Sequence, residues 1–169
     1  RRKFIMASIA GTLATGTAYK GWSFFSAKEN LPSFISCCMD NSNHYAITRI
    51  VNGKMLFSTS LPGRGHASLY HESLDHIINV ARRPDTWLQV TDAQNGELIS
   101  LNHTEKGFHF NGHACLSADH QLLLTSETSS ETQQGYIGVY DCLSNYRFLG
   151  HFSSGGIDPH EFRLLPDNE

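Results

Sequence analysis

The sequence contains few charged residues and almost no adjacent basic residues. Charged residues make up 17% of the 169 residues, and the formal net charge is −3. When the basic cluster Arg1–Lys3 is set aside, 10 basic residues stand against 16 acidic residues, and Arg82-Arg83 is the only adjacent basic pair left. The positive patch on which nucleic-acid binding depends is therefore missing, and we expect no nucleic-acid partner.

Sequence motifs of known metal sites and catalytic sites are missing too. The four cysteines do not have the spacing of a zinc site, and the adjacent Cys37-Cys38 would point to opposite faces of a strand. We interpret the cysteines as small apolar core residues; a Cys115–Cys142 disulfide in an oxidising compartment is the alternative. There is no glycine-rich phosphate loop and no Gly-x-Ser-x-Gly elbow. The sequence therefore does not predict an enzyme.

Helical periodicity is absent from Ser33 onward. Short runs rich in β-formers alternate with turn residues instead, and Asn52-Gly53 and Asn95-Gly96 have the composition of hairpin turns. The expected strands are Phe34–Met39, Tyr45–Val51, Met55–Ser60, Ala67–Tyr70, His76–Ala81, Thr86–Thr91, Leu98–Leu101, Ala114–Ser117, Gln121–Ser126, Tyr136–Tyr140, Arg147–Phe152 and Glu161–Leu165. The chain is therefore predicted to be all-β.

The N-terminus has the composition of an export signal. Arg1-Arg2-Lys3 precedes an uncharged run that ends at Tyr19 and is too short and too weakly apolar for a stable membrane span. The paired arginines, the short apolar stretch and the small residues after it resemble a twin-arginine signal. We expect residues 1–19 to be this signal, residues 20–32 a linker and residues 33–169 the folded domain. A surface helix is the alternative for residues 1–19.

A repeat with a period of 47 residues organises the domain. Gly65-His66-Ala67 recurs as Gly112-His113-Ala114, and Pro159-His160-Glu161 follows at the same spacing. Each histidine opens a short alternating apolar segment, which is typical of propeller blades. We predict a β-propeller with blades of four antiparallel strands that begin near these histidines. About three blades form only part of a ring. The chain is then either the N-terminal part of a longer protein or a half-propeller that oligomerises.

Several segments of the repeat resemble one family of proteins. They are LPGRGHASLYH (61–71), VARRPDTWLQVTDAQNGELI (80–99), FNGHACLSADHQLLLTSE (110–127), GYIGVYD (135–141) and SSGGIDPHEFRLLPD (153–167). In these segments the chain resembles the exported bacterial family called domain of unknown function 1513. The resemblance implies a seven-bladed propeller of the YVTN or quinoprotein-like type, about twice this length, in the periplasm. The family's gene neighbourhood implies a link to iron or metal uptake, with co-encoded periplasmic or outer-membrane metal-uptake proteins as partners.

The three repeat histidines are the main candidate site. Because equivalent loops of a propeller approach its central channel, His66, His113 and His160 are expected to converge there and could bind a transition metal as cofactor. Glu161 and Glu127 are candidate carboxylate ligands. The alternative is a structural role, in which each histidine fixes the turn between blades. Six other histidines of the domain are interpreted as surface or turn residues: His71, His76, His103, His109, His120 and His151.

Two further residues are candidates for binding a ligand. Arg82, at the end of a predicted strand, could face the channel and bind an anionic group; simple solvation of both Arg82 and Arg83 is the alternative. Glu127 begins a polar segment, Glu127–Gly135, that is long for a hairpin loop. This segment is a candidate functional loop; a loop that is merely mobile is the alternative.

Three functions fit these features. The preferred one is a non-enzymatic exported binding or scaffold protein linked to metal acquisition. The second is a metal-dependent hydrolase or lactonase that acts at the mouth of the channel. The third is a quinoprotein-like scaffold that has lost its cofactor.

Overall fold

The computed structural model describes residues 32–165, and its regular structure is β-sheet apart from one short 3-10 helix, η1 (Cys142–Ser144). The predicted signal and nearly all of the predicted linker lie outside these residues. Within the described range, no helix is both long enough and apolar enough to cross a bilayer. The prediction of an all-β fold is confirmed.

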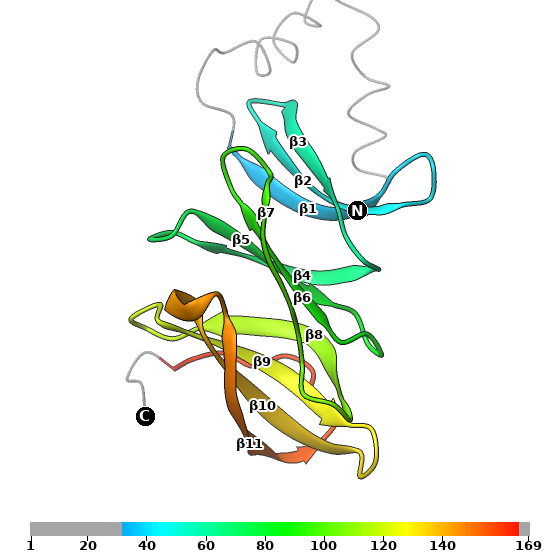
Figure 1. The fold of residues 1–169 in the computed structure, drawn as a ribbon, viewed down its shortest axis with the longest axis vertical. Helices are drawn as coiled ribbons and strands as arrows, with labels where there is room; N and C mark the ends of the chain where they lie inside the picture. The colour runs from blue at the N-terminus through cyan, green and yellow to red at the C-terminus, as the bar shows by residue number, and fades with distance from the viewer. Residues whose placement is uncertain (1–31, 166–169) are drawn as a thin grey trace, which may run out of the picture. The chain divides into compact units, whose positions relative to one another are not determined.

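The strands form three antiparallel sheets that follow one another along the chain (Figure 1). The first sheet contains β1 (Phe34–Met39), β2 (Tyr45–Val51) and β3 (Lys54–Ser60). The second contains β4 (Gly65–His71), β5 (His76–Ala81), β6 (Trp87–Asp92) and β7 (Leu98–His103). The third contains β8 (Phe108–Leu116), β9 (Leu122–Ser129), β10 (Gln134–Asp141) and β11 (Arg147–Ile157). Within each sheet, every strand pairs with the next one in sequence, as in the blades of a propeller.

The first strands of the second and third sheets lie against each other. Strand β4 contacts β8, and β5 also contacts β8. In the same way β1 and β2 contact β4. By position β1 therefore corresponds to β5, the second strand of a blade, and the first sheet has no strand equivalent to β4 and β8 among the described residues.

The second sheet carries most of the apolar core because it lies between the other two. All residues of β5 except the first, and all residues of β6 except the last, are buried. Burial of successive residues means that both faces of these strands are covered, since neighbouring side chains point to opposite faces. The largest aliphatic side chains in this layer, including Ile77, Ile78 and Leu88, are fully buried. Strand β3, at an outer edge, has mostly exposed residues.

The two predicted hairpin turns differ in geometry. Asn52 and Gly53 both have positive φ (51° and 74°), as a two-residue hairpin of type I′ requires. In the second hairpin only Gly96 has positive φ (79°), and its N–H donates to the carbonyl of Asp92 (3.0 Å). Both hairpins are confirmed, but the second has a longer turn than the dipeptide indicates.

Three predictions about local structure are wrong. The segment Glu161–Leu165 is not a strand, because no strand of residues 32–165 pairs with it. Strand β8 begins at Phe108 and not at Ala114, since a register shift between Phe110 and Ala114 hides the alternation of its first half. His71 is not a surface residue: it is 1% exposed, and its Nε2 lies 2.8 Å from the carbonyl oxygen of His120.

Candidate functional site

The three repeat histidines converge. The nearest ligand nitrogens of His66, His113 and His160 lie within 4.8 Å of one another. Nε2 of His66 is 3.1 Å from Nε2 of His113, and the ring centroids of His113 and His160 are 4.4 Å apart. His66 and His160 are exposed and His113 is half-buried, so the cluster faces solvent. We call these three residues the histidine trio; the sequence predicted that they would meet.

Strand irregularities direct the first two histidines of the trio. In β4 the register passes from Gly65 to Ala67 without a partner for His66. In β8 it passes from Phe110 to Ala114, and His113 lies in this gap. Such bulges bend a strand and turn the side chain of the extra residue out of the regular alternation. Each of these histidines is therefore placed by an interruption of its strand, which sequence periodicity does not reveal.

The glycine that precedes each of these two histidines is required by packing against the neighbouring blade. A Cβ at Gly112 would lie 2.6 Å from the ring of His66, and the φ of Gly112 is +101°. A Cβ at Gly65 would lie 2.5 Å from Sγ of Cys37. In each Gly-His pair, the glycine allows a side chain of the preceding blade to lie close to the strand, and the histidine projects into the trio.

Partial burial and neighbouring positive charges favour the neutral form of two imidazoles of the trio. Partial burial lowers the pKa of His66, and the charges of His113 and Arg82 lower it further. Partial burial also lowers the pKa of His113, followed by the charge of His160, while Glu161 opposes the effect. Neutral imidazole is the form that binds a metal ion. The contact between the two Nε2 atoms also needs at least one neutral ring, because one nitrogen must accept.

The spacing of the trio is close to that of a metal site. Ligands at about 2.0–2.1 Å from a tetrahedral metal lie roughly 3.3 Å apart. The distance between Nε2 of His66 and Nε2 of His113 already meets this value, and the third imidazole is within the 4.8 Å limit of the group. Three-coordinate binding would require the more distant imidazole nitrogens to move closer together. In residues 32–165, the trio is the one group of three or more His, Cys, Asp or Glu residues whose ligand atoms all lie close enough together to share a metal ion.

The predicted carboxylate ligands lie in different environments. Glu161 is exposed, and its negative charge acts to raise the pKa of His113. Its carboxylate also accepts hydrogen bonds from Nη2 and Nε of Arg163 (3.0 and 3.3 Å). These hydrogen bonds and the charge of Arg163 lower the pKa of Glu161. Glu161 is therefore an ionised neighbour of the trio.

Glu127, in contrast, is a fully buried residue of β9 and not part of a loop. Its carboxylate accepts hydrogen bonds from the hydroxyls of Thr104, Thr125 (2.6 Å) and Tyr140 (2.7 Å). The predicted loop shortens to a four-residue turn, 130–133, because β9 and β10 extend into it. These internal donors leave Glu127 enclosed within the third sheet, away from solvent.

His151 of β11 completes this second cluster. Its Nε2 lies 3.3 Å from a carboxylate oxygen of Glu127, and its Nδ1 lies 3.5 Å from Glu105. The ring stacks on Phe108, with centroids 4.1 Å apart. Only 10% of the side chain is exposed, so the prediction that His151 is a surface or turn residue is wrong. We call Glu105, Glu127 and His151, with the hydroxyls around Glu127, the Glu127 cluster.

Two arginines lie beside the trio. Arg64 and Arg82 are both exposed. The backbone N–H of Arg82 donates to the backbone carbonyl of Arg64 (2.9 Å). Both guanidinium charges lower the pKa of His66. Arg64 was not singled out from the sequence, although it precedes His66 by only two residues. Arg83 instead forms an ion pair with Asp158 (2.5 Å).

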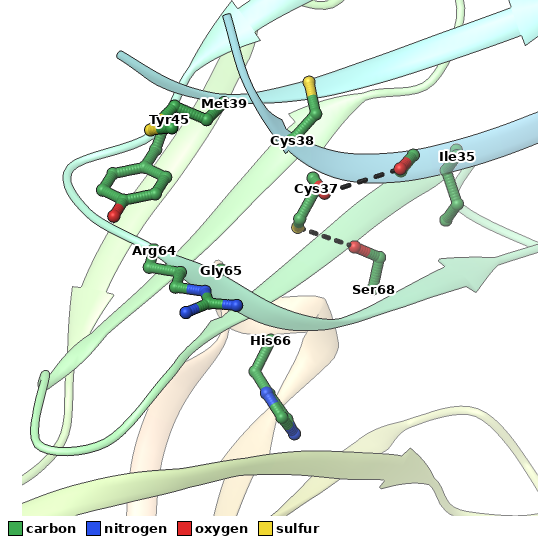
Figure 2. Close-up of a pocket in the computed structure, with 10 residues that line it drawn as sticks. Ile35, Cys37, Cys38, Met39, Tyr45, Arg64, Gly65, His66 and Ser68 are labelled. Carbon is green, nitrogen blue, oxygen red and sulfur yellow. Dashed lines mark hydrogen bonds between the residues drawn. The ribbon is translucent and has the colours of Figure 1, made fainter. Parts of the chain in front are cut away.

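A groove of about 700 Å³ lies between β1 and β4. It runs along the edge of β1 that has no strand partner in the described part of the chain. Figure 2 shows Arg64 and His66 near the start of β4, with His66 pointing away from β1. Within the groove, Sγ of Cys37 lies 3.2 Å from Oγ of Ser68, and burial raises the pKa of the thiol. Cys37 is therefore a packed thiol, in agreement with its interpretation as a small core residue.

Solved structures share this fold. One is the dihydro-heme d1 dehydrogenase NirN in complex with DHE, with a TM-score of 0.61 and 18% identity over 75% of this chain and 26% of that one. Another is the hydrazine synthase of Kuenenia stuttgartiensis, with a TM-score of 0.62 and 16% identity over 79% of this chain and 39% of that one. At this identity the similarity concerns the fold alone. The chain spans about a quarter to two fifths of the length of these proteins.

Sequence comparison identifies a family. No curated protein matches the chain. Residues 59–169, which include the whole histidine trio, match the family described as Protein of unknown function (DUF1513). This match covers the GRGH, ARRP and PHE segments on which the resemblance rests. With its blades of antiparallel strands and its repeated histidines, the chain belongs to the DUF1513 family.

Proposed function

We propose that this protein is an exported metal-binding β-propeller in which the histidine trio binds a divalent first-row transition metal. The observation that carries the proposal is the convergence of three imidazoles whose ligand nitrogens lie within 4.8 Å. Imidazole ligands favour zinc, copper, iron and nickel, whereas calcium and magnesium prefer oxygen ligands. Three protein ligands leave at least one coordination position free for another molecule.

Binding is favoured over hydrolysis. A metal-dependent hydrolase needs, besides the metal, a carboxylate free to act as general base. Glu161 is held by Arg163, and Glu127 is enclosed by hydroxyl donors. The hydrolase or lactonase alternative therefore lacks a supporting observation at this site.

A role in iron or metal uptake extends the proposal. It is supported by the exposure of the trio, because a metal ion bound at the surface can be passed to or from another protein. The partners would be the co-encoded periplasmic or outer-membrane proteins that the family resemblance implies. This role and the export of the protein stay predictions.

Metal titration of the full chain tests the proposal. We expect Ni²⁺ and Zn²⁺ to bind with one ion per molecule in isothermal titration calorimetry, while Ca²⁺ and Mg²⁺ give no heat. His66→Ala and His113→Ala each remove one of three ligands and should weaken binding by roughly 100-fold, the scale of losing a strong interaction of about 3 kcal/mol.

His103→Ala is the matched control. His103 is exposed on β7, and its only hydrogen bond within the described residues is to Oγ1 of Thr86 (3.1 Å). This variant should bind Ni²⁺ as the unmodified protein does. Equal Ni²⁺ affinity in the unmodified protein, His66→Ala and His113→Ala would overturn the proposal.

A further inference from the structure

The charge around the histidine trio is positive before any metal binds. The three imidazoles are neutral ligands and contribute no negative charge. Arg64 and Arg82 add two permanent positive charges, and their backbones are joined by the hydrogen bond from Arg82 N–H to Arg64 C=O. A divalent ion raises the total further. Like charges repel, most strongly at low salt, so a bare cation is a poor fit to this surface.

The two arginines beside the trio differ from the other arginines near it. Arg83 pairs with Asp158, and Arg163 pairs with Glu161. Within residues 32–165, no carboxylate lies within ion-pair distance of Arg64 or Arg82. Both side chains are exposed. A guanidinium offers a planar fork of donors that matches a carboxylate or phosphate, and here two of these forks are free.

The nearest acidic residue does not balance this charge. Glu161 acts on His113, but its carboxylate is already bonded to Arg163, which carries the opposite charge. The pair adds no net negative charge to the site. Among residues 32–165, no other carboxylate contributes to the electrostatics of His66 or His113, so an anion from solution can supply the negative charge that a metal on the trio would need.

We propose that the trio binds its metal together with a small chelating oxyanion, carboxylate or phosphate in chemistry. One group of oxygens occupies the coordination position that the histidines leave free, and the others accept hydrogen bonds from Arg64 and Arg82. No covalent bond is made or broken in this binding. The inference rests on the proposed metal site and names the class of molecule that shares it.

Geometry supports this division of roles. Arg64 and His66 are two residues apart at the start of β4, and Arg82 is joined to Arg64 across the β4–β5 pair. The arginines therefore border the trio on the side of His66.

Equilibrium dialysis of the full chain tests the inference. Radiolabelled citrate and radiolabelled phosphate are dialysed separately against the protein, each with and without Ni²⁺, at low ionic strength. We expect one of the two anions to be retained only when Ni²⁺ is present. Citrate retention identifies carboxylate chemistry, and phosphate retention identifies phosphate chemistry.

Arginine variants test whether the two guanidinium groups contribute to anion binding. Arg64→Gln and Arg82→Gln should each reduce anion retention by about twofold to fivefold, the range of an exposed charge pair at low salt. The same variants should bind Ni²⁺ alone as tightly as the unmodified protein or more tightly, because a repulsive charge is gone. Arg83→Gln is the control and should change neither value, since Arg83 is paired with Asp158.

The outcomes separate this inference from the proposed function. If Ni²⁺ binds to the trio but neither anion is retained, the anion inference is overturned and the metal site stands. If Arg83→Gln lowers retention as much as Arg82→Gln, a general surface charge explains it and the inference is again overturned. If Ni²⁺ itself does not bind, the proposed function fails.

Discussion

The histidine trio and the Glu127 cluster both gather titratable side chains, but in opposite environments. The trio gathers three imidazoles at the surface, and its nitrogens contact chiefly one another. The Glu127 cluster places a carboxylate at 0% exposure, where three hydroxyls donate to it and His151 lies 3.3 Å away. The first arrangement leaves ligand atoms available at the surface, whereas in the second the carboxylate oxygens of Glu127 are already hydrogen-bonded.

The difference shows which polar groups are available for function. A buried polar group is retained only when it is paired, because an unpaired one costs free energy. Glu127 meets this condition with donors from its own fold, so its role is to hold β9, β10 and β11 together. The trio has no such set of internal partners. Ligand atoms at the surface with few partners are the better indication of a binding site.

The largest expected effect is on Glu127. Glu127→Ala removes the acceptor of three buried hydroxyls and opens a cavity, so we expect the free energy of unfolding to fall by about 3–5 kcal/mol in urea denaturation of the full chain. Glu127→Gln, which keeps the shape and one acceptor oxygen, should cost less. Ni²⁺ affinity of the folded fraction should not change. A stable Glu127→Ala variant that no longer binds Ni²⁺ would reverse the comparison and make Glu127 a ligand.

Gly112→Ala should have a smaller effect on stability but a direct effect on the trio. The new Cβ would lie 2.6 Å from the His66 ring at a φ of +101°. Backbone strain of this kind costs about 1–2 kcal/mol, and we expect the displaced His66 ring to weaken Ni²⁺ binding by roughly tenfold. Urea denaturation and calorimetric titration measure the two effects.

Gly107→Ala separates the effect of backbone strain from the effect of displacing the His66 ring. Gly107 also has positive φ (+92°), but an added Cβ there would have no heavy atom within 4 Å. This variant should lose similar stability and keep full Ni²⁺ affinity. If Gly112→Ala also keeps full affinity, the position of the His66 ring does not matter for metal binding and the trio is not the site.

The repeat allowed the trio to be predicted because equivalent positions of successive blades lie side by side. The period of 47 residues placed the histidines in one register, and local β-patterning gave most strand ends within one to three residues. The bulges at His66 and His113 could not be predicted, since an extra residue in a strand depends on the partner strand. The prediction of a strand at Glu161–Leu165 was wrong for a related reason: local patterning does not supply the neighbour that a strand needs.

The environment of Glu127 could not be read from its neighbours in sequence. Thr104 and Tyr140, two of its donors, lie 23 and 13 residues away along the chain. The local polar run therefore indicated a loop, whereas the pairing of β9 with β10 buries its first residues. Gly138 carries the one signal for this burial, because a Cβ there would lie 2.0 Å from the Glu127 carboxylate. A glycine in the middle of a β-rich run indicates such a close approach.

The smallest expected effect is on the titration of the trio. Without metal, the ring protons of His66 and His113 should give NMR midpoints below the usual pKa of 6.5, because partial burial and the neighbouring positive charges disfavour the protonated form. In His113→Ala, the pKa of His66 should rise, since the charge of His113 contributes to the lowering. Because the pKa values of His66 and His113 are lower in the folded chain than in the unfolded chain, the unfolded chain binds protons more readily. The free energy of unfolding therefore decreases as the pH falls below 6.5.

The same shift decides the pH range of metal binding. Neutral imidazole binds the metal, so a lowered pKa keeps His66 and His113 available as ligands at a pH where an ordinary surface histidine is already protonated. Ni²⁺ binding should then persist below pH 6.5 and decline at lower pH. Midpoints for His66 and His113 at or above the usual value of 6.5 would remove the electrostatic difference between the trio and an ordinary surface histidine.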